Sequence, residues 1–125
     1  MPINLARFGK VLKELRINKG LTLREIYKLT GYDPSNWSKI ERGRISPPSD
    51  EKVLKKWARV LGVYGDEKEI QRFIDEAKIA QGIIPYDILS QENAVEYLPA
   101  FLRTLANKKL TKEEVDRLIE MIRNA

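Results

Sequence analysis

Residues 22–43, TLREIYKLTGYDPSNWSKIERG, decide the fold. Thr22 and Glu25 have the spacing of a capping box, in which the side chain of each residue accepts a hydrogen bond from the amide of the other at a helix start. Gly31 can adopt the left-handed conformation that ends a helix. The first part of this stretch therefore predicts a short helix that begins after Thr22 and ends before Gly31.

A second helix begins directly after this turn. Asp33 is a favourable N-cap residue, and Pro34 suits the first helical position because the amide it lacks would be unpaired there. This helix is expected to run to about residue 42 and to stop at Gly43. Two short helices joined by a tight glycine turn form a helix-turn-helix pattern, in which the second helix presents its first turn to a partner.

Apolar residues on both sides predict further helices. A helix capped by Asn4 and ending at Gly20 follows from Leu5, Phe8, Leu12 and Leu15. A fourth helix, capped by Ser49 or Asp50 and closed by Gly62, follows from Val53, Leu54, Trp57, Ala58 and Leu61. Together with residues 22–43 these helices predict a domain over residues 1–65.

Residues 66–125 predict a helical extension. One helix is expected at roughly 67–80, and a short one is expected to have Pro99 in its first turn and to end at Leu105. A second capping box, Thr111 with Glu114, opens the last helix. Because no stretch has the alternation of a strand, the predicted fold class is all-α: a helix-turn-helix domain with a C-terminal helical extension.

The amino-acid composition excludes several kinds of metal site and catalytic site. The chain has no Cys and no His, which excludes thiolate and imidazole metal sites and the catalytic triads built on those residues. Carboxylate pairs such as Glu113 with Glu114 fit solvated helix faces, and no glycine-rich phosphate loop occurs. We therefore expect no enzyme activity, no cofactor and no metal. With no membrane-length apolar segment and no signal peptide, a cytoplasmic protein is expected.

Charge is unevenly distributed along the chain. Residues 1–62 contain 14 Lys and Arg and 6 Asp and Glu residues, a balance of +8, and residues 63–125 contain 9 and 12, a balance of −3. A basic first half suggests binding to a polyanion, although a solvated lysine-rich surface would give the same count.

The motifs LRINKGLT (15–22), Gly31, SKIERG (38–43) and LGV (61–63) occur in an order and spacing that resembles one family. This family is the lambda-repressor-like group, also called XRE or Cro-type helix-turn-helix regulators, and the resemblance covers roughly residues 5–65. Two positions depart from its pattern. Tyr27 stands where a small residue is usual, and Leu23 stands where a glutamine is common. Tyr27 must therefore find room or point outward.

The resemblance implies roles for residues of the second helix. Ser35, Asn36 and Lys39 match the positions that the family turns toward DNA bases. Asn can pair with adenine through two hydrogen bonds, and Lys can donate to guanine. The alternative is that these three residues are ordinary solvent-facing side chains.

Further positions match contacts to DNA phosphates. Arg42 and Arg44 follow the second helix where the family binds the backbone, and Thr22 and Arg24 are weaker candidates at the start of the first helix. A surface charge cluster is the alternative for the two later arginines.

The remaining matched residues are expected to be structural. Arg16 and Glu41 match an internal salt bridge that fixes helix orientation in the family. Trp37 and Trp57 fall on apolar helical stripes, so both are expected in the core and not as stacking platforms for bases.

The predicted function is that of a sequence-specific regulator of transcription, a repressor, that binds double-stranded DNA as a homodimer. The apolar faces of residues 67–80 and 95–123 are expected to supply the dimer contact, or else to fold back as added core. The alternative is a DNA-binding antitoxin whose residues 66–125 hold a partner protein. A protein-interaction module that does not bind DNA is a third possibility, which Lys39, Arg42 and Arg44 oppose.

Overall fold

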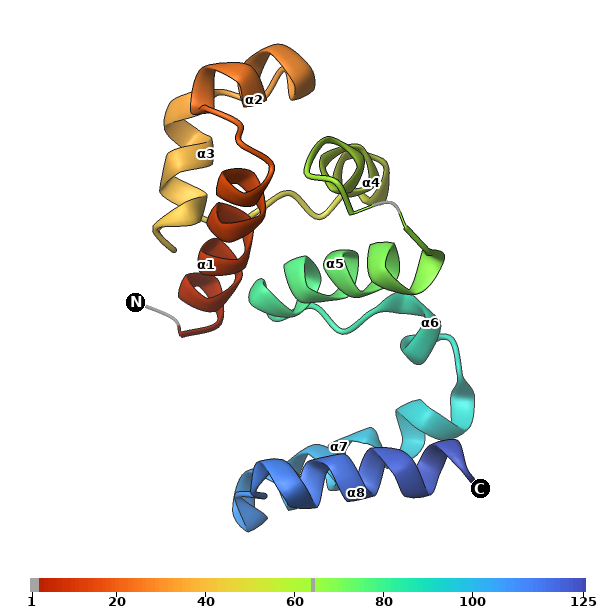
Figure 1. Ribbon diagram of the computed structural model, residues 1–125. Helices are drawn as coiled ribbons and strands as arrows, with labels where there is room; N and C mark the ends of the chain where they lie inside the picture. The colour runs from red at the N-terminus through yellow and green to blue at the C-terminus, as the bar shows by residue number, and fades with distance from the viewer. Residues whose placement is uncertain (1–2, 64) are drawn as a thin grey trace. The chain divides into compact units, whose positions relative to one another are not determined.

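The computed structural model describes residues 3–63 and 65–125, and within them every regular element is a helix (Figure 1). The chain divides into two compact units, residues 1–85 and 86–125. The first unit contains α1 (Ile3–Asn18), α2 (Leu23–Thr30), α3 (Pro34–Glu41), α4 (Glu51–Val60) and α5 (Glu67–Ala80). The second contains α6 (Tyr86–Leu89), α7 (Glu92–Lys108) and α8 (Lys112–Arg123). The all-α prediction is confirmed.

Local hydrogen bonds define the turn between α2 and α3. Thr22 Oγ1 accepts from the Glu25 amide at 3.1 Å, and Glu25 Oε1 accepts from the Thr22 amide at 3.1 Å. Gly31 has a φ of 75°, a conformation that other residues rarely adopt. Asp33 Oδ1 accepts from the amides of residues 35 and 36, at 2.7 and 3.1 Å. The caps predicted at Thr22 and Asp33 are therefore present.

The core of the first unit lies where its five helices meet. In the first unit of Figure 1, α1 packs against α3 and α5, α2 against α3 and α4, and α4 against α5. The centroids of the Trp37 and Trp57 rings are 4.2 Å apart, and both side chains are buried, as predicted. The other buried apolar residues are Phe8, Leu12, Ile26, Ile40, Leu54, Ala58, Leu61, Phe73, Ile74, Ala77 and Ala80.

Helix α5 belongs to this core. Phe73 and Ile74 are buried, and the Phe73 ring lies 5.7 Å from the ring of Phe8 on α1. The first unit therefore extends to Pro85, beyond the boundary predicted after residue 65. The expectation that the apolar face of residues 67–80 supplies a dimer contact is wrong, because that face is used inside the unit. The alternative of added core is correct for α5.

Polar contacts also attach α5 to the helices before it. Lys78 Nζ lies 2.7 Å from Glu51 Oε1 at the start of α4. Asn4 Nδ2 donates to the carbonyl oxygens of Ile79 at 3.2 Å and Ala80 at 2.7 Å. Asn4 was predicted to cap α1, which is wrong, because α1 begins at Ile3 and the Asn4 side chain bonds the last carbonyls of α5.

The second unit departs further from the sequence prediction. The capping box of Thr111 and Glu114 is present, with hydrogen bonds of 3.1 and 3.2 Å. Pro99, however, lies inside the 17-residue helix α7 and not in the first turn of a short one. The carbonyl of Val95 thereby loses the amide that would bond it at position 99, a loss that is tolerable because Val95 and Pro99 are exposed to water. None of the residues 86–125 is buried.

Candidate nucleic-acid interface

One side of α3 faces the core and the other faces solvent. Trp37 and Ile40 are buried on the inner side. Successive residues of a helix are rotated by about 100°, so Ser35 and Lys39, one turn apart, lie opposite them. Ser35 is exposed and Lys39 is half-buried. Asn36, also exposed, lies at the edge of this outer face. The three residues predicted to contact bases are thus on the accessible side of α3.

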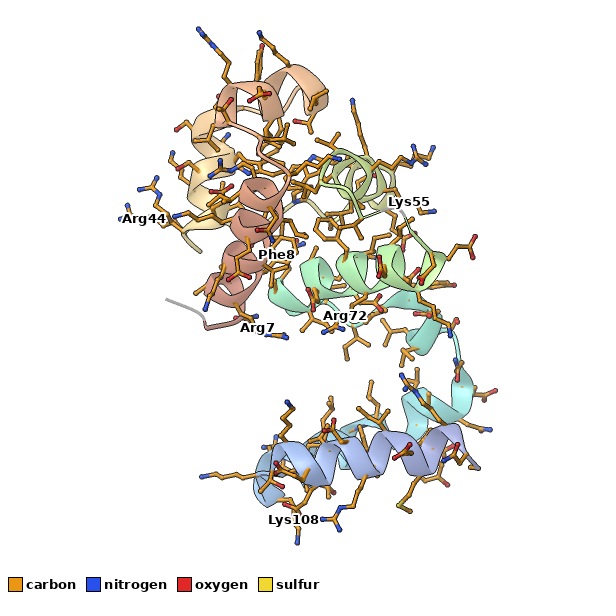
Figure 2. The ribbon with its side chains drawn as sticks, in the orientation of Figure 1. Arg7, Phe8, Arg44, Lys55, Arg72 and Lys108 are labelled. Atoms are coloured by element: carbon orange, nitrogen blue, oxygen red, sulfur yellow. The ribbon has the colours of Figure 1, made fainter. Side chains whose placement is uncertain are left out.

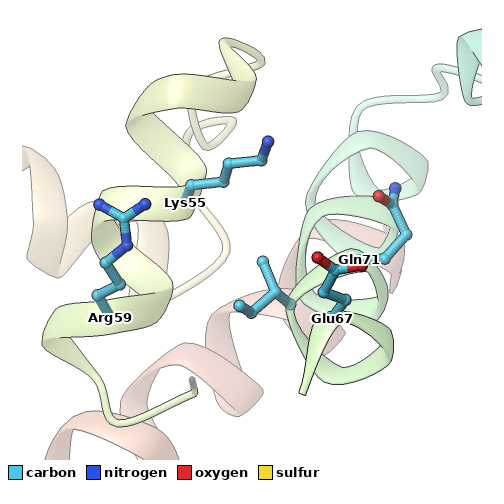
Figure 3. Close-up of a pocket in the computed structure, with 5 residues that line it drawn as sticks. Lys55, Arg59, Glu67 and Gln71 are labelled. Carbon is cyan, nitrogen blue, oxygen red and sulfur yellow. The ribbon is translucent and has the colours of Figure 1, made fainter. Parts of the chain in front are cut away.

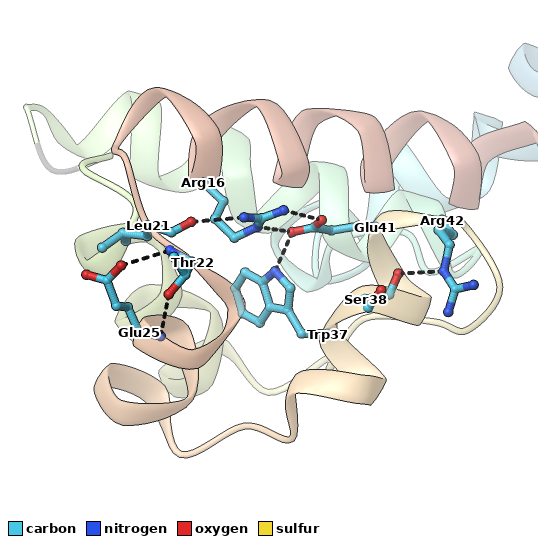
Figure 4. Close-up of polar contacts among 8 residues, drawn as sticks. All are labelled: Arg16, Leu21, Thr22, Glu25, Trp37, Ser38, Glu41 and Arg42. Carbon is cyan, nitrogen blue, oxygen red and sulfur yellow. Dashed lines mark hydrogen bonds and ion pairs between the residues drawn. The ribbon is translucent and has the colours of Figure 1, made fainter.

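The C-terminal end of α3 is positively charged. Arg42 and Arg44 are both exposed, and Figure 2 shows the Arg44 side chain extending away from the helices. Arg42 Nε donates to the Ser38 carbonyl at 3.3 Å, which leaves the outer part of its guanidinium for another acceptor (Figure 4). Glu41, the sole carboxylate between residues 34 and 44, points inward with 5% of its side chain exposed. The outer surface here therefore carries net positive charge.

The start of α2 suits an anion less well. Thr22 and Arg24 are exposed, but the Thr22 amide is already bonded to Glu25. Hydrogen bonds from the backbone and side chain of Thr22 lower the pKa of the Glu25 carboxyl, so this group is charged at neutral pH. A carboxylate beside the helix start opposes a phosphate there. Of the two predicted contacts in this region, Arg24 is the stronger candidate.

A buried ion pair fixes α3 against α1. Arg16 Nε lies 2.6 Å from Glu41 Oε2, and a second guanidinium nitrogen donates to Glu41 Oε1 at 3.0 Å (Figure 4). The Trp37 indole nitrogen also donates to Glu41 Oε2, at 2.7 Å. The side chains of Arg16 and Glu41 are only 14% and 5% exposed. The predicted pair is thus present, and its geometry is that of a two-pronged, largely desolvated salt bridge.

The same arginine reaches a third segment. A terminal nitrogen of Arg16 donates to the carbonyl oxygen of Leu21 at 2.9 Å, just before α2 begins. The hydrogen bond to Glu41 raises the pKa of Arg16, so the guanidinium is charged at any ordinary pH. One side chain of α1 thereby holds both the start of α2 and the end of α3, which sets the orientation of the outer face.

Glycine at position 9 allows α3 to approach α1 closely. A Cβ atom at Gly9 would lie 2.5 Å from the carbonyl oxygen of Glu41 and nearer still to that of Ile40. Both are backbone atoms, which cannot move aside as a flexible side chain can. Sequence reasoning missed this residue, although a glycine inside an amphipathic helix is itself a sign of close packing. It also missed Ser38, which lies half-exposed between Ser35 and Arg42.

The departures from the family pattern are accommodated without strain in the core. The Tyr27 side chain points outward and is 51% exposed, so it takes no room between α2 and α3. Leu23 is half-buried and packs against the core. Neither residue displaces the outer face of α3.

The sequence profile of a family described as "Helix-turn-helix domain" matches residues 7–70, more than half of the chain. The chain belongs to the helix-turn-helix family. The match runs from α1 into the first turn of α5, and α2 and α3 form the helix-turn-helix of this DNA-binding domain. Comparisons with curated proteins and with solved structures gave no significant match.

A concave region of the helix-turn-helix domain lies between α4 and α5. It encloses about 340 Å³ and is lined by Lys55, Arg59, Glu67, Ile70 and Gln71. Figure 3 shows Lys55 and Arg59 on α4, with the Lys55 side chain extending toward α5, and Glu67 and Gln71 on α5. Glu67 is the sole carboxylate of this lining, so the groove offers no pair of carboxylates for acid–base work. In the described residues no helix is long and apolar enough to cross a membrane.

Proposed function

We propose that this helix-turn-helix protein is a sequence-specific regulator of transcription of the XRE type, and that it represses by occupying an operator in double-stranded DNA. Helix α3 enters the major groove. The observation that carries this proposal is the outer face of α3, which is accessible to solvent, free of carboxylates and bordered by the exposed Arg42 and Arg44. Selection of bound oligonucleotides from a random pool tests it: a recurring motif supports the proposal, and retention without a motif contradicts it.

The residues divide into two roles on the DNA. Ser35, Asn36 and Lys39 contact base edges, since hydroxyl, amide and ammonium groups match the donors and acceptors of the major groove. Arg42 and Arg44 contact phosphates beyond the end of α3, and Arg24 and Thr22 contact phosphates at the start of α2. No enzyme activity and no cofactor belong to this function.

A single helix-turn-helix reads few base pairs, so we further propose that the protein binds as a homodimer to two half-sites about one turn of DNA apart. The selected motif is then expected to be an inverted repeat. A selected motif without two-fold symmetry would contradict the homodimer and leave DNA binding standing.

Lys39→Ala is expected to weaken binding to the selected operator by ~1–3 kcal/mol and to relax base preference at one position, because its ammonium group is proposed to donate to a base. Asn36→Ala is expected to act similarly at a different position. Fluorescence anisotropy with matched and scrambled duplexes measures both effects. Equal losses on every duplex would remove the residue from the base readers. The matched control is Lys13→Ala, an exposed lysine on α1.

Arg42→Ala is expected to weaken binding to all duplexes alike and to reduce the slope of log affinity against log salt by about one unit, because one phosphate contact is lost. Titrations at several salt concentrations measure the slope. An unchanged slope would contradict a phosphate contact by Arg42.

A second candidate function is that of a DNA-binding antitoxin. The exposed apolar side chains of α7 and α8 favour it, because a partner protein could cover them. The discriminating observation is a neighbouring gene for a small toxin whose product co-purifies with the full chain in a defined ratio. Purification of the full chain alone, as a stable dimer, would oppose this function.

A further inference from the structure

The second unit is apolar on its surface and has no core of its own. None of its 40 residues is buried. Helices α7 and α8 instead expose Val95, Tyr97, Phe101, Leu102, Val115, Ile119, Met121 and Ile122, each by 38–70%. Units of about this size without disulfides or metals usually need a partner to fold stably. A continuous apolar surface of this kind is characteristic of a protein interaction site.

The charges of this unit are also unpaired. It contains six Lys and Arg and seven Asp and Glu residues, yet residues 86–125 form no ion pair with one another. On α7, Glu92, Glu96 and Arg103 are all exposed. At about 100° per residue they lie within about 40° of one another around the helix. Acidic residues thus precede a basic one along a single flank of α7.

This flank borders an apolar stripe. Val95 and Leu102 are two turns apart on α7, and they are 41% and 47% exposed. Consider a second copy of α7 that runs antiparallel and is related by a two-fold axis midway between these residues. Val95 of each copy then lies opposite Leu102 of the other, and each flank faces its counterpart.

In that arrangement the charges become complementary. Arg103 of one copy then lies opposite position 94 of the other, midway between Glu92 and Glu96. Each glutamate is two residues away, which is about 3 Å along the helix axis at a rise of about 1.5 Å per residue. In a parallel two-fold pair this flank would instead face the opposite flank of the other copy, where Ala94, Phe101 and Leu105 carry no charge to pair with it. The sequence of α7 is therefore complementary to itself in one direction only.

We propose that residues 86–125 form a two-fold interface with the same residues of a second copy, in which α7 pairs antiparallel through Val95 and Leu102, flanked by Arg103 beside Glu92 and Glu96. Val115, Ile119 and Ile122 of α8 extend the apolar surface. This inference deepens the proposed function, since it assigns the contact that joins the two half-site readers. It uses neither α3 nor α5.

The apolar part is tested on the full chain by sedimentation equilibrium without DNA. The unmodified protein is expected to be a dimer, and Leu102→Asp is expected to raise its dissociation constant at least ~30-fold, because a carboxylate would be buried without a partner. The matched control is Tyr97→Asp, because Tyr97 lies on the opposite side of α7 and is 67% exposed. This variant is expected to change the dissociation constant of the dimer less than ~3-fold. A monomeric full chain, or equal effects of the two variants, would overturn the proposal.

The charge pairing is tested by mixing two charge-reversal variants. Because the mixture is expected to restore the dimer, the result cannot be explained by a loss of folding. Arg103→Glu alone and Glu92→Lys with Glu96→Lys alone each place like charges together, so both homodimers are expected to weaken ~10-fold or more. Mixed in equal amounts, the two variants restore opposite charges at both ends of the contact. Native mass spectrometry is expected to show mainly the heterodimer. A statistical mixture, or a full chain that associates only with another protein, would contradict the two-fold contact.

Because these measurements contain no DNA, their failure is distinguishable from failure of the proposed function. A monomer that still selects a single half-site would overturn the interface alone. A dimer that selects no DNA motif would overturn the function alone.

Discussion

Glu41→Gln is expected to destabilise the protein by ~3–5 kcal/mol and to weaken operator binding as a consequence. The change keeps the shape of the side chain but removes its charge. The Arg16 guanidinium, 14% exposed, is then left without its counter-charge. Removing one partner of a buried pair costs this much because the other partner remains desolvated. Urea denaturation followed by tryptophan fluorescence measures the loss, since Trp37 bonds the same carboxylate.

Two variants serve as controls for this prediction. Glu76→Gln affects two ion pairs, with Arg72 at 3.3 Å and with Arg7 at 4.0 Å. Both arginines are exposed, by 77% and 68%, so a loss below ~1 kcal/mol is expected. The double variant of Arg16→Met and Glu41→Gln removes both charges and retains an acceptor for the Trp37 indole. It is expected to be more stable than Glu41→Gln alone. If it is less stable by the sum of both single losses, the two charges do not act as a pair.

Gly9→Ala is expected to destabilise the protein by ~1–3 kcal/mol, which is the opposite of the usual effect of this change within a helix. Alanine ordinarily stabilises a helix by ~1 kcal/mol relative to glycine. Here its Cβ would meet the carbonyl oxygens of Ile40 and Glu41, so α1 and α3 must move apart. Denaturant unfolding measures the stability, and operator affinity reports the displaced α3.

The control for Gly9→Ala is Ala6→Leu, a larger apolar addition at an exposed position of the same helix. It is expected to change stability by less than ~0.5 kcal/mol. A gain in stability for Gly9→Ala would show that α1 and α3 tolerate a wider separation.

The caps of α2, α3 and α8 could be predicted because each depends on residues at most three positions apart. Asn4 illustrates the limit of such reasoning. Its residue type suits a cap, but the carbonyls it bonds are 75 and 76 residues away, at the end of α5. The packing of α5 into the first unit could not be predicted for the same reason. Whether the apolar face of residues 67–80 packs inward or outward depends on α1 and α4, which periodicity alone does not reveal.

Pro99 shows a different limit. The preference of proline for a first turn is a local rule, but α7 begins seven residues earlier and continues through the proline, because water can satisfy the carbonyl that loses its bond. For the candidate interface, sequence reasoning identified residues on the accessible side of α3 but missed Gly9. The contacts of Ser35, Asn36 and Lys39 with bases stay predictions, since they depend on a molecule outside the chain.

The aspartate at the start of α3 has a thermodynamic consequence. Since Asp33 already bonds the amides of residues 35 and 36, this helix is wound before any duplex arrives. Binding to DNA then carries no entropic cost of ordering α3. The heat-capacity change of binding should therefore reflect only the surface buried in the contact, without the larger contribution that folding upon binding adds.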